Sequence, residues 1–204
     1  EQMNNVRLWQ NVGVGKNELK DFSIFEEQKD GIFIRVYSID RMPVNYAKEG
    51  SRWKRNAYGI VRLETPIARP NGDTMKYHLP KGQAVLPFFH RALLDKYDKG
   101  ESIRVLYLTE GYFKAFKAQM HGLDCIGLPS ITCMRDRETG KLHGDIHKLL
   151  QKCKVQKVVW LTDGDCRNRT SKEIEPGADL YRRPAQFFRT IQTFSDLLSN
   201  YDDI

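Results

Sequence analysis

Three acidic residues that follow apolar stretches are the residues of this sequence best suited to chemistry. Glu110 ends one apolar run beside Gly111, and Asp163 and Asp165 follow another run on either side of Gly164. Parallel α/β sheets present ligands at the carboxyl ends of their strands, so these carboxylates would share one edge. Two carboxylates about 4 Å apart repel by roughly 4 kcal/mol at an effective dielectric of about 20, and a bound cation removes that repulsion. The pattern therefore predicts a divalent-metal site.

The same acidic residues also fit a simpler interpretation as turn or helix-capping residues, because Asp-Gly-Asp is common in loops. Two features favour a shared site. Asp163 follows an apolar strand directly, and Glu110 holds the matching place 53 positions earlier, which leaves room for two crossovers. Mg²⁺, or Mn²⁺ in its place, suits such a site because it takes oxygen ligands and retains water and substrate phosphates.

The second half of the chain carries the alternating strand and helix patterns that would position these carboxylates. Strands are predicted over residues 103–109, 124–128 and 156–162, with helices over 112–121 and 144–153. This order is typical of right-handed crossovers and a parallel sheet. If the first and third strands are neighbours, Glu110 and Asp163 arrive side by side.

A last helix is predicted over residues 184–199, opening with a proline at a position that tolerates one. Apolar residues recur along it at helical spacing, which indicates core packing. They are Phe187, Phe188, Ile191, Phe194 and Leu198.

The first half has a different rhythm. Short alternating runs over residues 31–39, 58–64 and 75–79 are separated by proline and glycine turns and predict a small antiparallel sheet. Residues 88–97 predict a short helix, and residues 22–29 are also read as helical. We therefore divide the chain into a mixed α+β part, residues 1–100, and an α/β part, residues 101–204.

Composition narrows the class of protein. The 204 residues carry a formal net charge of +7, which fits a polyanionic partner. No apolar run is long enough to span a bilayer and no signal-peptide pattern begins the chain, so we expect no membrane association and a cytoplasmic location. The four cysteines form no CxxC pair, which argues against a zinc ribbon.

One basic segment combines cations with an aromatic ring. Arg52, Trp53, Lys54 and Arg55 would suit single-stranded DNA, with cations for phosphates and a ring for stacking on bases. A solvated loop anchored by its tryptophan explains the same residues equally well.

The chain resembles the toprim family, which includes bacterial-type DNA primases, topoisomerases and certain nucleases. The resemblance rests on Glu110-Gly111 at a strand end before a helix and on Asp163-Gly164-Asp165 after a later strand, and it covers about residues 101–199. The tract from Leu108 to Ala115 is most similar to primase-helicase proteins of phages and plasmids. The resemblance to the toprim family implies a Rossmann-type parallel sheet flanked by helices, preceded by a small subdomain with antiparallel strands.

The resemblance also implies roles for the acidic residues. Glu110 would act as general acid/base or help to bind metal, and Asp163 and Asp165 would hold Mg²⁺. Lys114 stands where many primases have an acidic residue. We expect Lys114 and the basic run Arg167, Arg169 and Lys172 to bind phosphates of nucleotide or template.

The function expected from the resemblance is that of a DNA primase. It would join nucleoside triphosphates into RNA primers on single-stranded DNA during replication of a phage, plasmid or other mobile element. Because the chain begins without Met and ends one helix after the acidic pair, we expect it to come from a larger protein that carries a helicase or zinc-binding module. A helicase module, in the same polypeptide or in trans, is the expected protein partner. A toprim nuclease and a non-catalytic nucleic-acid-binding module remain the alternatives.

Overall fold

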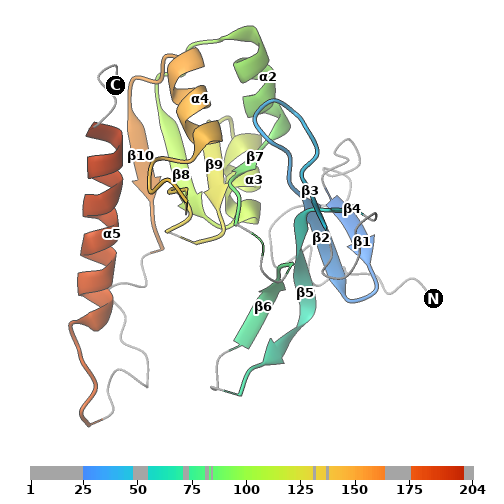
Figure 1. The fold of residues 1–204 in the computed structure, drawn as a ribbon, viewed down its shortest axis with the longest axis vertical. Helices are drawn as coiled ribbons and strands as arrows, with labels where there is room; N and C mark the ends of the chain where they lie inside the picture. The colour runs from blue at the N-terminus through green and yellow to red at the C-terminus, as the bar shows by residue number, and fades with distance from the viewer. Residues whose placement is uncertain are drawn as a thin grey trace.

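A computed structural model describes residues 25–47, 55–70, 74–80, 83, 85–130, 132–136, 138–163 and 176–199 of the chain (Figure 1). In these ranges the chain is a mixed α/β protein with three sheets and four helices. The helices are α2 (Arg91–Lys99), α3 (Tyr112–Met120), α4 (Gly144–Lys152) and α5 (Arg182–Ser199). None of the described helices has both the length and the apolar character needed to cross a membrane.

The central sheet has four strands in the order β10-β8-β9-β7. Its strands are β7 (Phe88–Phe89), β8 (Leu106–Glu110), β9 (Cys125–Leu128) and β10 (Val158–Leu161). Strand β8 is parallel to both β9 and β10, and β7 runs antiparallel to β9. The sheet is therefore parallel except at one edge, and β7 enters it from before residue 101.

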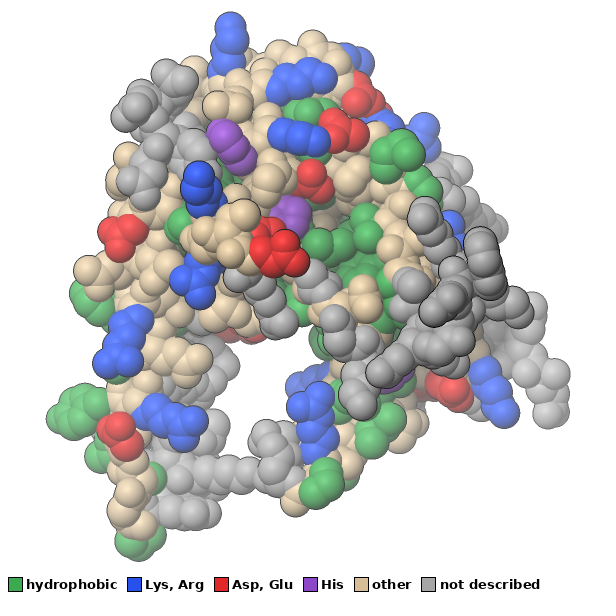
Figure 2. All heavy atoms as spheres, viewed as in Figure 1, with side chains coloured by type: hydrophobic (Ala, Val, Ile, Leu, Met, Phe, Trp, Pro, Cys, Tyr) green, Lys and Arg blue, Asp and Glu red, His purple; other side chains and the backbone are tan. Residues whose placement is uncertain are grey.

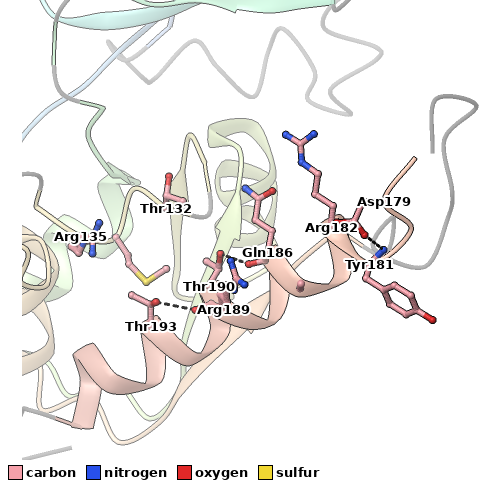
Figure 3. Close-up of a pocket in the computed structure, with 11 residues that line it drawn as sticks. Thr132, Arg135, Asp179, Tyr181, Arg182, Gln186, Arg189, Thr190 and Thr193 are labelled. Carbon is pink, nitrogen blue, oxygen red and sulfur yellow. Dashed lines mark hydrogen bonds between the residues drawn. The ribbon is translucent and has the colours of Figure 1, made fainter. Parts of the chain in front are cut away.

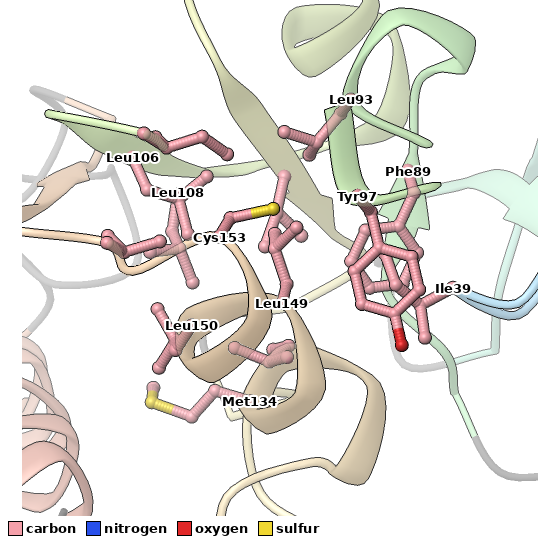
Figure 4. Close-up of a cluster of buried hydrophobic side chains, with 14 of the residues drawn as sticks. Ile39, Phe89, Leu93, Tyr97, Leu106, Leu108, Met134, Leu149, Leu150 and Cys153 are labelled. Carbon is pink, nitrogen blue, oxygen red and sulfur yellow. The ribbon is translucent and has the colours of Figure 1, made fainter. Parts of the chain in front are cut away.

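Helices cover both faces of this sheet because successive strand residues point to opposite sides. Leu106 and Leu108 of β8 pack with α2 and α4 in a first core cluster (Figure 4). On the other face, the neighbouring Tyr107 packs with α3 in a second cluster. The edge strand β10 is covered by α5, whose Phe194 ring meets the Trp160 ring edge-on with centroids 4.7 Å apart.

The residues before β7 form an antiparallel sheet in the order β1-β2-β5-β6 and a separate two-stranded ribbon. The sheet contains β1 (Phe25–Gln28), β2 (Gly31–Arg35), β5 (Gly59–Ala68) and β6 (Thr74–His78), and the ribbon contains β3 (Asn45–Ala47) and β4 (Arg55–Ala57). Ile32 and Ile34 of β2 are fully buried in the second cluster, against α3. The antiparallel sheet thus packs on the helix that follows Glu110.

Most predicted elements lie where the sequence placed them, and three predictions are wrong. Residues 25–28 form β1 and not a helix, because they pair with β2 across a tight turn. The helix predicted from residue 88 begins at Arg91, since Phe88 and Phe89 pair with β9. The apolar stripe on α5 is only partly core: Phe194 is buried, but Phe188 is 67% exposed and Ile191 is 42% exposed.

Candidate functional site

The two acidic strand ends meet at one edge of the central sheet. Strands β8 and β10 are parallel neighbours in which Leu161 aligns with Thr109. Glu110 is the last residue of β8, and Asp163 lies two residues after the end of β10. The condition that these two strands be neighbours is met, and both residues belong to the carboxyl edge.

Local packing fixes the turn that follows Glu110. Gly111 has a φ of 106°, a conformation that glycine adopts readily, and its N–H donates to the carbonyl of Leu128 at 2.7 Å. The next residue, Tyr112, starts α3, and its hydroxyl donates to the carbonyl of Leu86. The Tyr112 ring also stacks on Phe88, with centroids 5.2 Å apart. A buried anchor thus holds the start of α3, and with it the end of β8.

Lys114 reaches the predicted metal site from the first turn of α3. Its ammonium group forms an ion pair with the carboxylate of Asp163. The two side chains are 51% and 46% exposed. An ion pair this exposed is worth about 0–1 kcal/mol, so it holds Asp163 only weakly. The sequence predicts phosphate binding by Lys114; in the structure its described partner is the carboxylate of Asp163.

The donors at this edge fit a hard divalent cation. Glu110 is partly buried and Asp163 is exposed, so the edge offers carboxylate oxygens and access to water. Among the described residues, no three His, Cys, Asp or Glu side chains are grouped closely enough to hold a metal. Asp165, the third predicted ligand, lies outside the described ranges. Glu110 and Asp163 could each supply oxygen to Mg²⁺ or Mn²⁺.

The remaining predicted binding residues fall mostly where the structure gives no description. The basic run of Arg167, Arg169 and Lys172 lies outside the described ranges, and so do Arg52, Trp53 and Lys54. Arg55 is the first residue of β4, and only its backbone is described.

Sequence reasoning missed a cationic cavity beside the central sheet. Arg182 and Arg189 of α5 line it together with Arg135, which precedes α4 (Figure 3). Arg182, Gln186, Arg189 and Thr193 recur at helical spacing, and that polar face was the signal available in the sequence. The prediction used the apolar face of this helix alone.

No protein-family model matches this chain, and no curated protein or solved structure matches it either.

Proposed function

We propose that this chain is a primase-like toprim protein that joins ribonucleotides into short primers on single-stranded DNA. One observation carries the proposal: β8 and β10 are parallel neighbours, so Glu110 and Asp163 lie at the same carboxyl edge of the sheet. That edge is where open α/β sheets bind their ligands. The positive net charge of the chain supports a polyanionic substrate.

In the proposed reaction, the 3′-hydroxyl of one nucleotide attacks the α-phosphorus of the next. A phosphodiester bond forms, and the bond to pyrophosphate breaks. Asp163 and Asp165 would hold Mg²⁺, which when bound supplies positive charge that neutralises the developing oxyanions. Glu110 would accept the proton of the attacking hydroxyl or share in binding the metal.

The ion pair between Lys114 and Asp163 favours a second candidate, a nucleic-acid-binding module without catalytic activity. In such a module the lysine ammonium group would take the place of a metal ion beside Asp163. We rank the primase first because exposed ion pairs are weak. A divalent cation that binds Asp163 has to offset at most about 1 kcal/mol from the ion pair with Lys114. Lys114 would then be released to contact a substrate phosphate.

Incubating the protein with labelled single-stranded DNA, ribonucleotides and Mg²⁺ separates these functions. Extension products, lost in Glu110→Gln and Asp163→Asn, would support the primase. Shortened strands would identify a nuclease instead. If neither forms while DNA binding persists and weakens with salt, the binding module is correct. Glu138→Gln is the matched control, because Glu138 is exposed and lies in the loop before α4.

A further inference from the structure

A cavity of about 460 Å³ lies between the first half of α5 and the segment that follows β9 (Figure 3). Thr132, Met134 and Arg135 form one wall. The other wall comes from α5 and the residues just before it, and includes Asp179, Arg182, Gln186 and Arg189. Figure 2 shows Lys and Arg side chains along the surface that α5 forms. The volume lies in the range typical of ligand sites.

The charges in this cavity call for an anionic ligand. Arg135, Arg182 and Arg189 are exposed, and none of them forms an ion pair with a carboxylate in the part of the chain that the structure describes. Among the described lining residues one is acidic, Asp179, and its carboxylate accepts the backbone N–H of Tyr181 at 2.9 Å. The described lining thus carries three guanidinium groups and one carboxylate, an excess of positive charge.

Most hydrogen-bond donors in the cavity belong to planar, positively charged guanidinium groups, which suit phosphate. The hydroxyls of Thr190 and Thr193 donate to helix carbonyls at 2.8 and 2.9 Å, so their hydrogens are already used. The guanidinium groups therefore provide most of the hydrogen-bond donors. Arginine binds phosphate through two parallel N–H donors, which makes phosphate the favoured anion.

The spacing and the place of the arginines indicate an extended chain of phosphates. Arg182 and Arg189 are seven residues apart on α5, a rise of about 10 Å, and Figure 3 shows their side chains extending in different directions, which suits contacts to separate phosphates of one strand. The cavity lies at the carboxyl edge, because Thr132 follows the end of β9, where Leu128 pairs with Glu110. In Figure 1 the first half of α5 projects past this edge.

We propose that this cavity binds the backbone phosphates of a single-stranded nucleic acid and leads the strand along the carboxyl edge of the sheet. The choice of a nucleic acid over another polyanion rests on the function proposed above. Contacts to the backbone alone position a strand without reading its sequence, so binding here is independent of base composition.

The test is fluorescence anisotropy of a labelled oligothymidylate, measured in EDTA without nucleotides at several salt concentrations. Replacing Arg135, Arg182 and Arg189 together with alanine should weaken binding about tenfold or more and flatten the dependence of log K on log salt by about 2, since each lost phosphate contact on a single strand contributes about 0.7. The triple lysine variant should keep most of the affinity. Arg104→Ala should bind like wild type, because Arg104 is exposed at the opposite, amino edge of the sheet.

Unchanged oligonucleotide affinity in the triple alanine variant would overturn the proposal. If that variant also fails to bind ATP in a separate titration that the wild type passes, the arginines would instead form a triphosphate site. Because the assay contains no metal or substrate nucleotide, its outcome is separate from primer synthesis. Strand binding that depends on the three arginines in a protein that makes no primer would keep this site and reject the primase.

Discussion

Among the described residues of the carboxyl edge, the side chain of Lys114 balances part of the acidic charge. Lys114 pairs with Asp163, so without a metal ion this edge is not purely acidic. Both side chains are about half exposed, and such a pair contributes little to the free energy of unfolding. If Asp163 binds a metal ion as proposed, Lys114 would affect that binding more than it stabilises the fold.

We expect Lys114→Met to raise the affinity for Mg²⁺ by up to about fivefold, because removing the ammonium group ends a competition worth up to about 1 kcal/mol. Isothermal titration of Mg²⁺ measures this. Lys114→Glu should raise the affinity further by adding a carboxylate. Lys117→Met, on the same helix, is the control and should behave like wild type. Weaker Mg²⁺ binding in Lys114→Met would show that the lysine supports the site.

A second residue, His90, makes stability depend on pH. It is buried at the start of α2, where its Nδ1 accepts the backbone N–H of Ala92 at 3.1 Å. Burial lowers the pKa of His90 to about 4, against the opposing effect of Asp95. Because the unfolded pKa is about 6.5, the unfolded chain binds this proton first, and the stability present above pH 6.5 is lost as the pH falls towards 4.

We expect the free energy of unfolding to fall by about 2–3 kcal/mol from this group between about pH 7.5 and 4.5. Urea denaturation of wild type and His90→Asn at both pH values measures it. Asparagine keeps an acceptor for the helix cap but does not titrate. Over the same pH range, the free energy of unfolding of the variant should therefore fall by about 2–3 kcal/mol less than that of wild type. Equal losses in the two proteins would assign the acid sensitivity to other groups.

At the scale of elements, the position of Glu110 depends on how closely β9 approaches α3. Gly127 of β9 lies under the start of this helix. A Cβ added there would lie 3.0 Å from the Cβ of Ala115 and 3.1 Å from the carbonyl oxygen of Gly111. Both contacts are tighter than ordinary packing, so a side chain at residue 127 requires α3 or the turn at Gly111 to shift by a few tenths of an ångström.

Gly127→Ala should therefore lower the free energy of unfolding by about 1–3 kcal/mol, as overpacked positions do, and weaken Mg²⁺ binding by displacing the turn after Glu110. Gly144→Ala is the matched control. Nothing lies within 4 Å of an added Cβ there, and as the first residue of α4 it should gain up to about 1 kcal/mol of helix stability. Urea denaturation of both variants measures the difference, and equal stabilities would contradict the tight contact.

The elements that sequence periodicity predicted are those long enough to show a period. Strands β8, β9 and β10 and helices α3 and α4 are of this kind. The two-residue β7 and the three-residue β3 and β4 carry no readable pattern, since their existence depends on partners distant in sequence. Helix α2 begins after a histidine cap, which is not among the usual capping residues.

The candidate site was predictable in part for the same reason. The acidic residues after apolar runs indicated a shared edge of the sheet. That inference required β8 and β10 to be neighbours, and the periodicity of a single segment does not determine the order of strands in a sheet. The pairing of Lys114 with Asp163 depends on the turn at Gly111 and on where α3 points, so only the folded chain shows it. The cavity lined by arginines is formed by two segments about 50 positions apart in the sequence, so local patterns could not predict it.

At the scale of the whole molecule, the two predicted halves share their cores. Ile39, from the first half, is fully buried among residues of α2, α4 and the central sheet (Figure 4). Its backbone N–H donates to the carboxylate of Asp145 in α4 at 3.2 Å, and the adjacent Asp40 pairs with Lys148. In the second cluster, Phe25 of β1 stacks on Phe113 of α3. Neither half buries its apolar surface without the other.

We therefore expect one cooperative unfolding transition in urea, with the same midpoint by far-ultraviolet circular dichroism and by tryptophan fluorescence. Ile39→Ala should lower the free energy of unfolding by about 2–5 kcal/mol, because it leaves a cavity where the halves meet. Ile67→Ala, at a side chain 50% exposed on β5, should change it by less than about 0.5 kcal/mol. Two separate transitions, or an Ile39→Ala variant in which only one probe shifts, would show that the halves unfold independently.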